Sequence, residues 1–177
     1  METLKPFGEL TEPDKRNFYF AVVDGKEMAC RMTLKDIHEH VALITLHDNV
    51  PDDVKSHFAQ AQNLAVYSWF HYQFNVTAQL LGFVSVEYAL KKKTGSKSKF
   101  KFLIDRAIAE GWIQDDGFAI AKLRENPETS YVDVLSSVMP KLRNDLAHGS
   151  DMLHNNALSS LRICADFINQ LFLADER

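Results

Sequence analysis

A short stretch near the C-terminal end, residues 143–149 (RNDLAHG), combines a guanidinium, an amide and an imidazole. Arg143 can bind a phosphate through its rigid fork of donors, and His148 can act as a general acid or base. Asn144 can orient the imidazole or a ribose hydroxyl. Attack of an RNA 2′-hydroxyl on the adjacent phosphodiester needs little more than proton transfer and charge stabilisation at phosphorus, so this set can support it without a metal. Alternatively, such residues at a helix end only satisfy carbonyls and the helix dipole.

The segment that must position these side chains, residues 131–147, has the apolar periodicity of a helix. Gly149 is placed to end this helix in a left-handed conformation, and Pro140 is expected to kink or divide it. Apolar residues three and four apart predict its buried stripe: Val134, Leu135, Val138, Met139, Leu142 and Leu146.

The helical spacing places the polar residues on two different faces. Asn144 and His148 are four residues apart and share a face. Arg143 lies roughly 140° around the helix from His148, at about 100° per residue. One helix therefore cannot easily aim both side chains at one small group, whereas two copies packed about a two-fold axis can do so.

At these residues the sequence resembles the HEPN superfamily, whose signature is an arginine and a polar residue followed by a histidine after four to six intervening positions. Arg143, Asn144 and His148 match the four-residue version, and the flanking residues match the pattern RN-x-x-AHG. A second stretch, residues 85–91 (SVEYALK), resembles the acidic second helix of that fold, with Glu87 as the matching carboxylate. The resemblance covers about residues 51–172.

The resemblance implies an all-α fold, an antiparallel four- to five-helix bundle that dimerises and brings two such motifs together at a cleft. Many members are metal-independent endoribonucleases of toxin–antitoxin and phage-defence systems, and others are non-catalytic RNA-binding, nucleotide-binding or protein-interaction modules. The expected partners are a second copy, RNA, and a cognate antitoxin or regulatory protein. Asp145 and His154 are candidate supporting residues. The first 49 residues do not match the family pattern and leave the subfamily open.

Size and composition favour one soluble domain. The chain has 177 residues and a formal net charge of −4, which argues against a nucleic-acid binder that is basic all over. No uncharged apolar run reaches the roughly 18 residues of a membrane span, and the N-terminus lacks the apolar region of a signal peptide. Cys30 and Cys164 lie in apolar surroundings and are expected to be reduced, buried thiols in the cytoplasm. No nucleotide-binding fingerprint predicts a cofactor.

Against this acidic background, one segment is strongly basic. Such a patch can follow an RNA backbone and would make binding sensitive to salt. Alternatively, the lysines only end a helix and solvate its surface. The candidate RNA-binding residues are Lys91, Lys92, Lys93, Lys97, Lys99 and Lys101.

The remaining elements follow from periodicity and turn residues. Residues 1–50 are expected to form a loose polar arm up to Arg16, a hairpin and a short helix, and residues 51–177 the bundle. The hairpin pairs 18–23 with 27–31 around Asp24-Gly25. The expected helices are 33–47, two antiparallel helices within 51–93 joined by a turn at 69–75, 100–109, 118–125, 131–147 and 153–173. His38, His40 and His47 lack the spacing of a zinc site, so no metal is expected.

Overall fold

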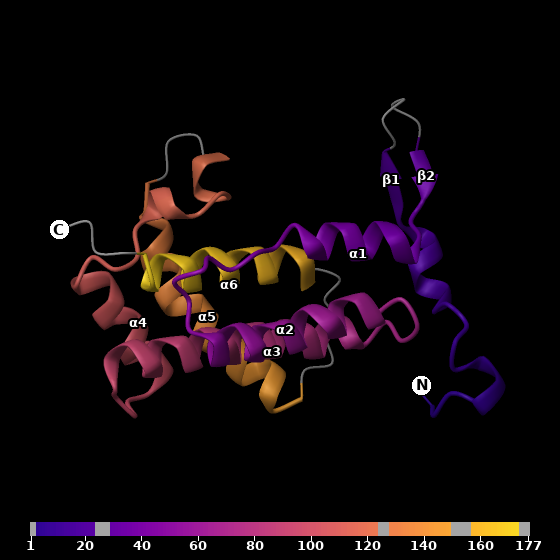
Figure 1. The fold of residues 1–177 in the computed structure, drawn as a ribbon, viewed down its shortest axis with the longest axis horizontal. Helices are drawn as coiled ribbons and strands as arrows, with labels where there is room; N and C mark the ends of the chain where they lie inside the picture. The colour runs from indigo at the N-terminus through magenta and orange to yellow at the C-terminus, as the bar shows by residue number, and fades with distance from the viewer. Residues whose placement is uncertain (1–2, 24–28, 124–127, 150–156, 174–177) are drawn as a thin grey trace.

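The computed structural model describes residues 3–23, 29–123, 128–149 and 157–173. It is mostly helical, which confirms the predicted all-α bundle with a small N-terminal arm (Figure 1). The helices are α1 (Leu34–Ala42), α2 (Asp52–Tyr67), α3 (Phe74–Thr94), α4 (Phe100–Ala109), α5 (Tyr131–Ala147) and α6 (Ala157–Leu171). The strands are β1 (Ala21–Val23) and β2 (Ala29–Arg31). Short 3-10 turns cover Phe7–Glu9, Lys15–Tyr19, Asp115–Gly117 and Ala121–Leu123.

Helix α3 is the centre of the bundle and packs against α2, α4, α5 and α6. It is buried on more than one face, and even the polar Gln79, Ser85 and Glu87 are buried. Gly82 sets how closely α6 approaches, because a Cβ there would lie 2.8 Å from Leu161 Cδ2. The polar residues of α3 are therefore held at positions fixed by the core.

Most predicted helix boundaries agree with the structure. The ranges of α4 and α5 are those predicted, and the chain turns between α2 and α3 within residues 69–75. Helix α1 ends at Ala42 and not at His47 as predicted, after a start fixed by a capping box between Thr33 and Asp36. Where a helix was predicted at 118–125, the described residues form only a 3-10 turn at Ala121–Leu123.

The predicted buried stripe of α5 was wrong, and of the two alternatives for Pro140 only a kink stays a prediction. The helix runs through Pro140 as one element and is not divided there. Its buried stripe is also rotated from the predicted one, since Val134 is 37% and Val138 is 42% exposed. The residues that face the core are Val132, Leu135, Ser136, Met139 and Leu146.

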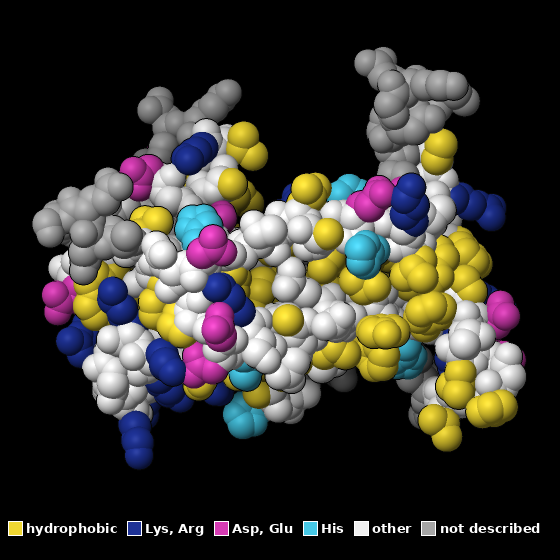
Figure 2. All heavy atoms as spheres, viewed as in Figure 1, with side chains coloured by type: hydrophobic (Ala, Val, Ile, Leu, Met, Phe, Trp, Pro, Cys, Tyr) yellow, Lys and Arg dark blue, Asp and Glu magenta, His cyan; other side chains and the backbone are white. Residues whose placement is uncertain are grey.

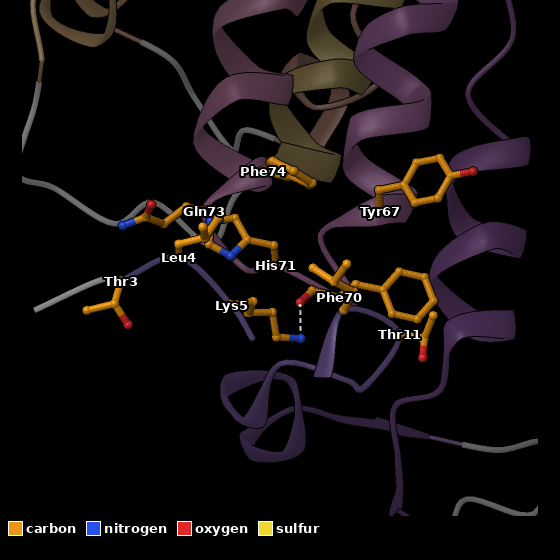
Figure 3. A pocket seen from close by; sticks show the side chains of 10 residues that line it. Thr3, Leu4, Lys5, Thr11, Tyr67, Phe70, His71, Gln73 and Phe74 are labelled. Carbon is orange, nitrogen blue, oxygen red and sulfur yellow. Dashed lines mark hydrogen bonds between the residues drawn. The ribbon is translucent and has the colours of Figure 1, made fainter. Parts of the chain in front are cut away.

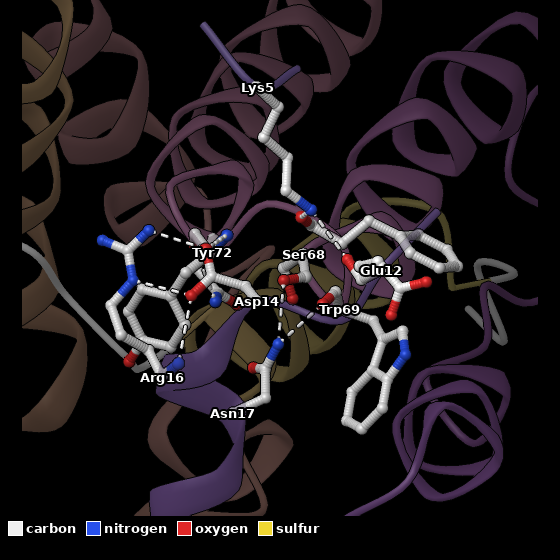
Figure 4. A network of polar contacts seen from close by, with 10 residues as sticks. Lys5, Glu12, Asp14, Arg16, Asn17, Ser68, Trp69 and Tyr72 are labelled. Carbon is white, nitrogen blue, oxygen red and sulfur yellow. Dashed lines mark hydrogen bonds and ion pairs between the residues drawn. The ribbon is translucent and has the colours of Figure 1, made fainter. Parts of the chain in front are cut away.

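The N-terminal arm is bound to the turn between α2 and α3, so the prediction of a loose segment was wrong (Figure 4). The Asp14 N–H donates to Trp69 O at 2.8 Å, and the Asp14 carboxylate accepts from the Tyr72 N–H at 3.0 Å. The Asn17 side-chain amide donates to Ser68 O and Trp69 O. Arg16 donates to Asp14 as well, and this hydrogen bond holds the Asp14 pKa well below its usual value.

The predicted hairpin is present as an antiparallel pair. The partners are Ala21 with Arg31, Val22 with Cys30 and Val23 with Ala29. The predicted Asp24-Gly25 turn lies outside the described residues. Cys30 is exposed, contrary to the prediction, because this short ribbon projects from the bundle (Figure 1), whereas Cys164 on α6 is buried as predicted.

Candidate functional site

Arg143 on α5 points toward α3, where the resemblance placed its matching carboxylate. Its Nη2 donates to Glu87 Oε2 at 2.8 Å, and its Nη1 donates to the Asn144 side-chain oxygen at 3.1 Å. The Glu87 side chain is only 10% exposed, and that of Arg143 is 32% exposed. Two motifs that are 56 residues apart in the sequence therefore meet through one partly buried ion pair.

Lys91, one turn after Glu87 on α3, completes this cluster. Its ammonium donates to Glu87 Oε1 at 2.7 Å, so a single carboxylate balances two cations. Among the described residues, the buried Arg143 Nε has no hydrogen-bond partner. Such an orphaned donor is costly and uncommon in native structures. The cluster of Lys91, Glu87, Arg143 and Asn144 thus keeps a net positive charge and unused donor capacity.

The rest of the motif is open to solvent at the end of α5. Asn144, Asp145 and His148 are exposed. His148 is the C-cap residue, and its backbone N–H donates to Asn144 O at 3.0 Å. Gly149 follows with φ of 89°, the left-handed conformation that was predicted to end the helix.

Within one chain, Arg143 and His148 are not joined by a contact. The guanidinium contacts Glu87 on α3, while the imidazole of His148 has no hydrogen bond or ion pair to any described residue. The geometry of α5 thus keeps them on separate faces, as their spacing indicates. His154, the predicted supporting histidine, lies outside the described residues.

The six candidate lysines surround the junction of α3 and α4, and three of them are already paired with acids. Besides Lys91, Lys92 contacts Asp53 of α2 at 2.5 Å, and Lys101 contacts Asp105 at 3.1 Å. Lys93 lies over the Trp112 ring, 5.4 Å from its centroid. Lys97 and Lys99 are exposed and pair with none of the described residues. Basic side chains gather at this end of the molecule in Figure 2, and the unneutralised charge is greatest in the α3–α4 loop.

The structure also reveals a polar network between α2 and α3 that was not predicted from the sequence. His57 Nδ1 lies 2.8 Å from Ser85 Oγ, and its ring stacks on Tyr88. The Tyr88 hydroxyl donates to Asp53, whose pKa is lowered mainly by the hydrogen bond from Lys92. The spacing of Asp53 and His57 one helical turn apart was the available signal. Ser85 is fully buried, so this network braces two helices and does not present a nucleophile.

Two further observations on the described residues concern metal binding and membrane-spanning helices. No group of three histidine, cysteine or acidic side chains gathers closely enough to hold a metal ion within this part of the chain. Helices with the length and apolar character needed to cross a bilayer are also absent from it. Comparison with known protein families, with curated proteins and with solved structures gives no match to this chain.

Proposed function

We propose that this protein is a homodimeric, metal-independent endoribonuclease that acts on single-stranded RNA and belongs to a toxin–antitoxin or phage-defence system of the HEPN kind. The observation that supports it best is the contact of Arg143 with Glu87, which orients the guanidinium beside Asn144, one turn before the exposed His148. A cytoplasmic location and a cognate antitoxin or regulatory partner belong to the same proposal.

In this proposal, Arg143 binds the scissile phosphate through the donors that Glu87 and Asn144 leave free. His148 takes the proton of the 2′-hydroxyl while that oxygen bonds to phosphorus. The bond to the 5′-oxygen breaks and this oxygen takes a proton from water, while His148 returns its proton to the solvent, so the products are a 2′,3′-cyclic phosphate and a 5′-hydroxyl. Asn144 orients the imidazole, and the exposed lysines of the α3–α4 loop guide the strand.

The two catalytic groups come from different subunits. Because Arg143 faces α3 and His148 faces solvent on the same helix, a shared site needs the guanidinium of one copy and the imidazole of the other. Asp145, which is exposed at the end of α5, would lie near this shared cleft.

The first experiment is a cleavage assay on a labelled single-stranded RNA in the presence of EDTA. His148→Ala is expected to lower the rate by about 10²- to 10⁴-fold, the usual contribution of a general acid or base. His38→Ala, at an exposed histidine on α1, is the matched control and should cleave at the wild-type rate. A substrate with a 2′-deoxy sugar at the cleavage position should resist. Equal cleavage by wild type and His148→Ala would contradict the proposal.

A mixing experiment tests the shared site. Arg143→Gln and His148→Ala are each inactive alone, but refolding them together forms mixed dimers that contain one intact site. Since half of the dimers are mixed and half of their sites are intact, about a quarter of the wild-type activity should return. No recovery, with mixed dimers demonstrated by mass, would place both residues in one chain.

The alternative function is a non-catalytic module that binds a nucleotide or protein partner. It is favoured by the engagement of Arg143 with Glu87 and Asn144, an arrangement that also serves as a purely structural brace. RNA profiles that are identical for the wild type and a folded Arg143→Gln variant would support this alternative.

A further inference from the structure

An apolar hollow of about 620 Å³ lies between the N-terminal arm and the turn that joins α2 to α3 (Figure 3). Leu4 and Leu10 line it from the arm, and Tyr67, Phe70 and Phe74 line it from the helices. Its volume is within the range of small-molecule sites, which are mostly apolar with a few polar groups. The hollow has the size and lining of a ligand site.

The wall formed by the arm is held by specific hydrogen bonds. Asp14 and Asn17 attach the following segment to the backbone at Ser68, Trp69 and Tyr72 (Figure 4). Leu4 is 94% exposed even so. The apolar surface at this end of the molecule is visible in Figure 2. An apolar ligand can cover the exposed apolar surface of this anchored arm.

Lys5 gives the hollow its charge. Its half-buried ammonium donates to Phe70 O at 3.0 Å and to Glu12 O at 2.7 Å. An ammonium has three donors, so one remains. Among the described residues, no carboxylate pairs with Lys5. His71 and Thr11 are further polar members of the lining. A cation that contacts only carbonyl dipoles attracts an anionic group of a ligand.

We propose that this hollow binds an amphipathic organic anion, a molecule with an apolar body of about ten carbon atoms and one carboxylate. The body covers the leucine and aromatic side chains, which removes apolar surface from water. The carboxylate accepts the remaining Lys5 donor. The site is separate from the α5 motif, so its occupation and RNA cleavage are tested independently.

The test is calorimetric titration of the full chain with three probes that share one tail and differ in head charge. These are decanoate, decanamide and decyltrimethylammonium, each kept below the concentration at which it forms micelles. Decanoate is expected to bind at least tenfold more tightly than the amide, and the cation most weakly. Shortening decanoate to octanoate should weaken binding by up to about 15-fold, because two methylenes leave the apolar surface.

Two variants locate the binding. Lys5→Met keeps an apolar stem, and it should abolish the preference for decanoate over decanamide. Thr11→Trp places a ring in the hollow and should weaken all three probes, whereas Thr45→Trp, at an exposed threonine outside the hollow, should bind as the wild type does. If Lys5→Met proves unfolded by circular dichroism, the Thr11→Trp comparison and the head-group series decide the question.

Equal affinity for the three head groups would overturn the proposal, as would wild-type binding by Thr11→Trp. Sedimentation velocity gives a further check on a competing occupant. If the wild type is a dimer that decanoate does not dissociate, and the Thr11→Trp variant is a monomer, then a second copy occupies the hollow. This result also overturns the proposal.

Discussion

Replacing Glu87 by glutamine should show how strongly the buried ion pair holds α5 on α3. The change keeps the size of the side chain and removes its charge. Glu87 accepts hydrogen bonds from two cations, Arg143 at 2.8 Å and Lys91 at 2.7 Å. A hydrogen bond to a charged group contributes about 1.5–3 kcal/mol, and an i,i+4 pair on a helix contributes about 0.3–0.5 kcal/mol.

The expected cost follows from the burial of the partners. Glutamine retains one acceptor oxygen, and the Arg143 side chain is one third exposed, so the full penalty of a buried unpaired charge does not apply. We expect Glu87→Gln to lower the free energy of unfolding by about 2 kcal/mol. Urea unfolding followed by circular dichroism measures this directly, with the midpoint shifted and the slope unchanged.

A double-mutant cycle with Arg143→Met isolates the pair, and an exposed pair supplies the matched control. The coupling of Glu87 with Arg143 should be about 1.5 kcal/mol. The control pair, Asp53 and Lys92, is closer at 2.5 Å, but both side chains are nearly half exposed, so its coupling should be clearly weaker than that of Glu87 with Arg143. Equal coupling in the two pairs would mean that burial does not set the strength of these ion pairs.

Two further predictions concern residues on α6. Burial raises the pKa of the Cys164 thiol and shields it from reagents. In the native protein an alkylating reagent should therefore modify only the exposed Cys30 rapidly, and Cys164 should react after denaturation. Rapid modification of both thiols in the native state would contradict this. Burial also raises the pKa of Asp166 above 3.8, so its contribution to stability is greatest below that pH and is lost as the pH rises through the folded value. Urea unfolding at several pH values should therefore show that the Asp166→Asn variant becomes more stable relative to the wild type as the pH increases. A difference in the free energy of unfolding that stays constant with pH would contradict this.

Residue order alone predicts most of the helical elements and the local geometry of the motif. The bounds of α4 and α5 follow from apolar periodicity and from the residues that end helices, because these signals act within a few residues of each other. The left-handed Gly149 and the separation of Arg143 from His148 around α5 also follow from local geometry. The pairing of Arg143 with Glu87 was suggested only by a family resemblance, since periodicity does not indicate which helices are neighbours.

Which helix faces and which charges remain available depends on how the helices pack together. The burial of Val132 in place of Val134 depends on where α3 and α4 lie, and a rotation of α5 by a fraction of a turn exchanges them. The charge of Lys92 is balanced by Asp53, which is 39 residues away in the sequence. The arm appeared loose because its anchoring groups are mostly backbone carbonyls and N–H groups, which every sequence carries. The same hydrogen bonds position the wall of the hollow beside Lys5. Because they join residues far apart in the sequence, the hollow could not be predicted from residue order.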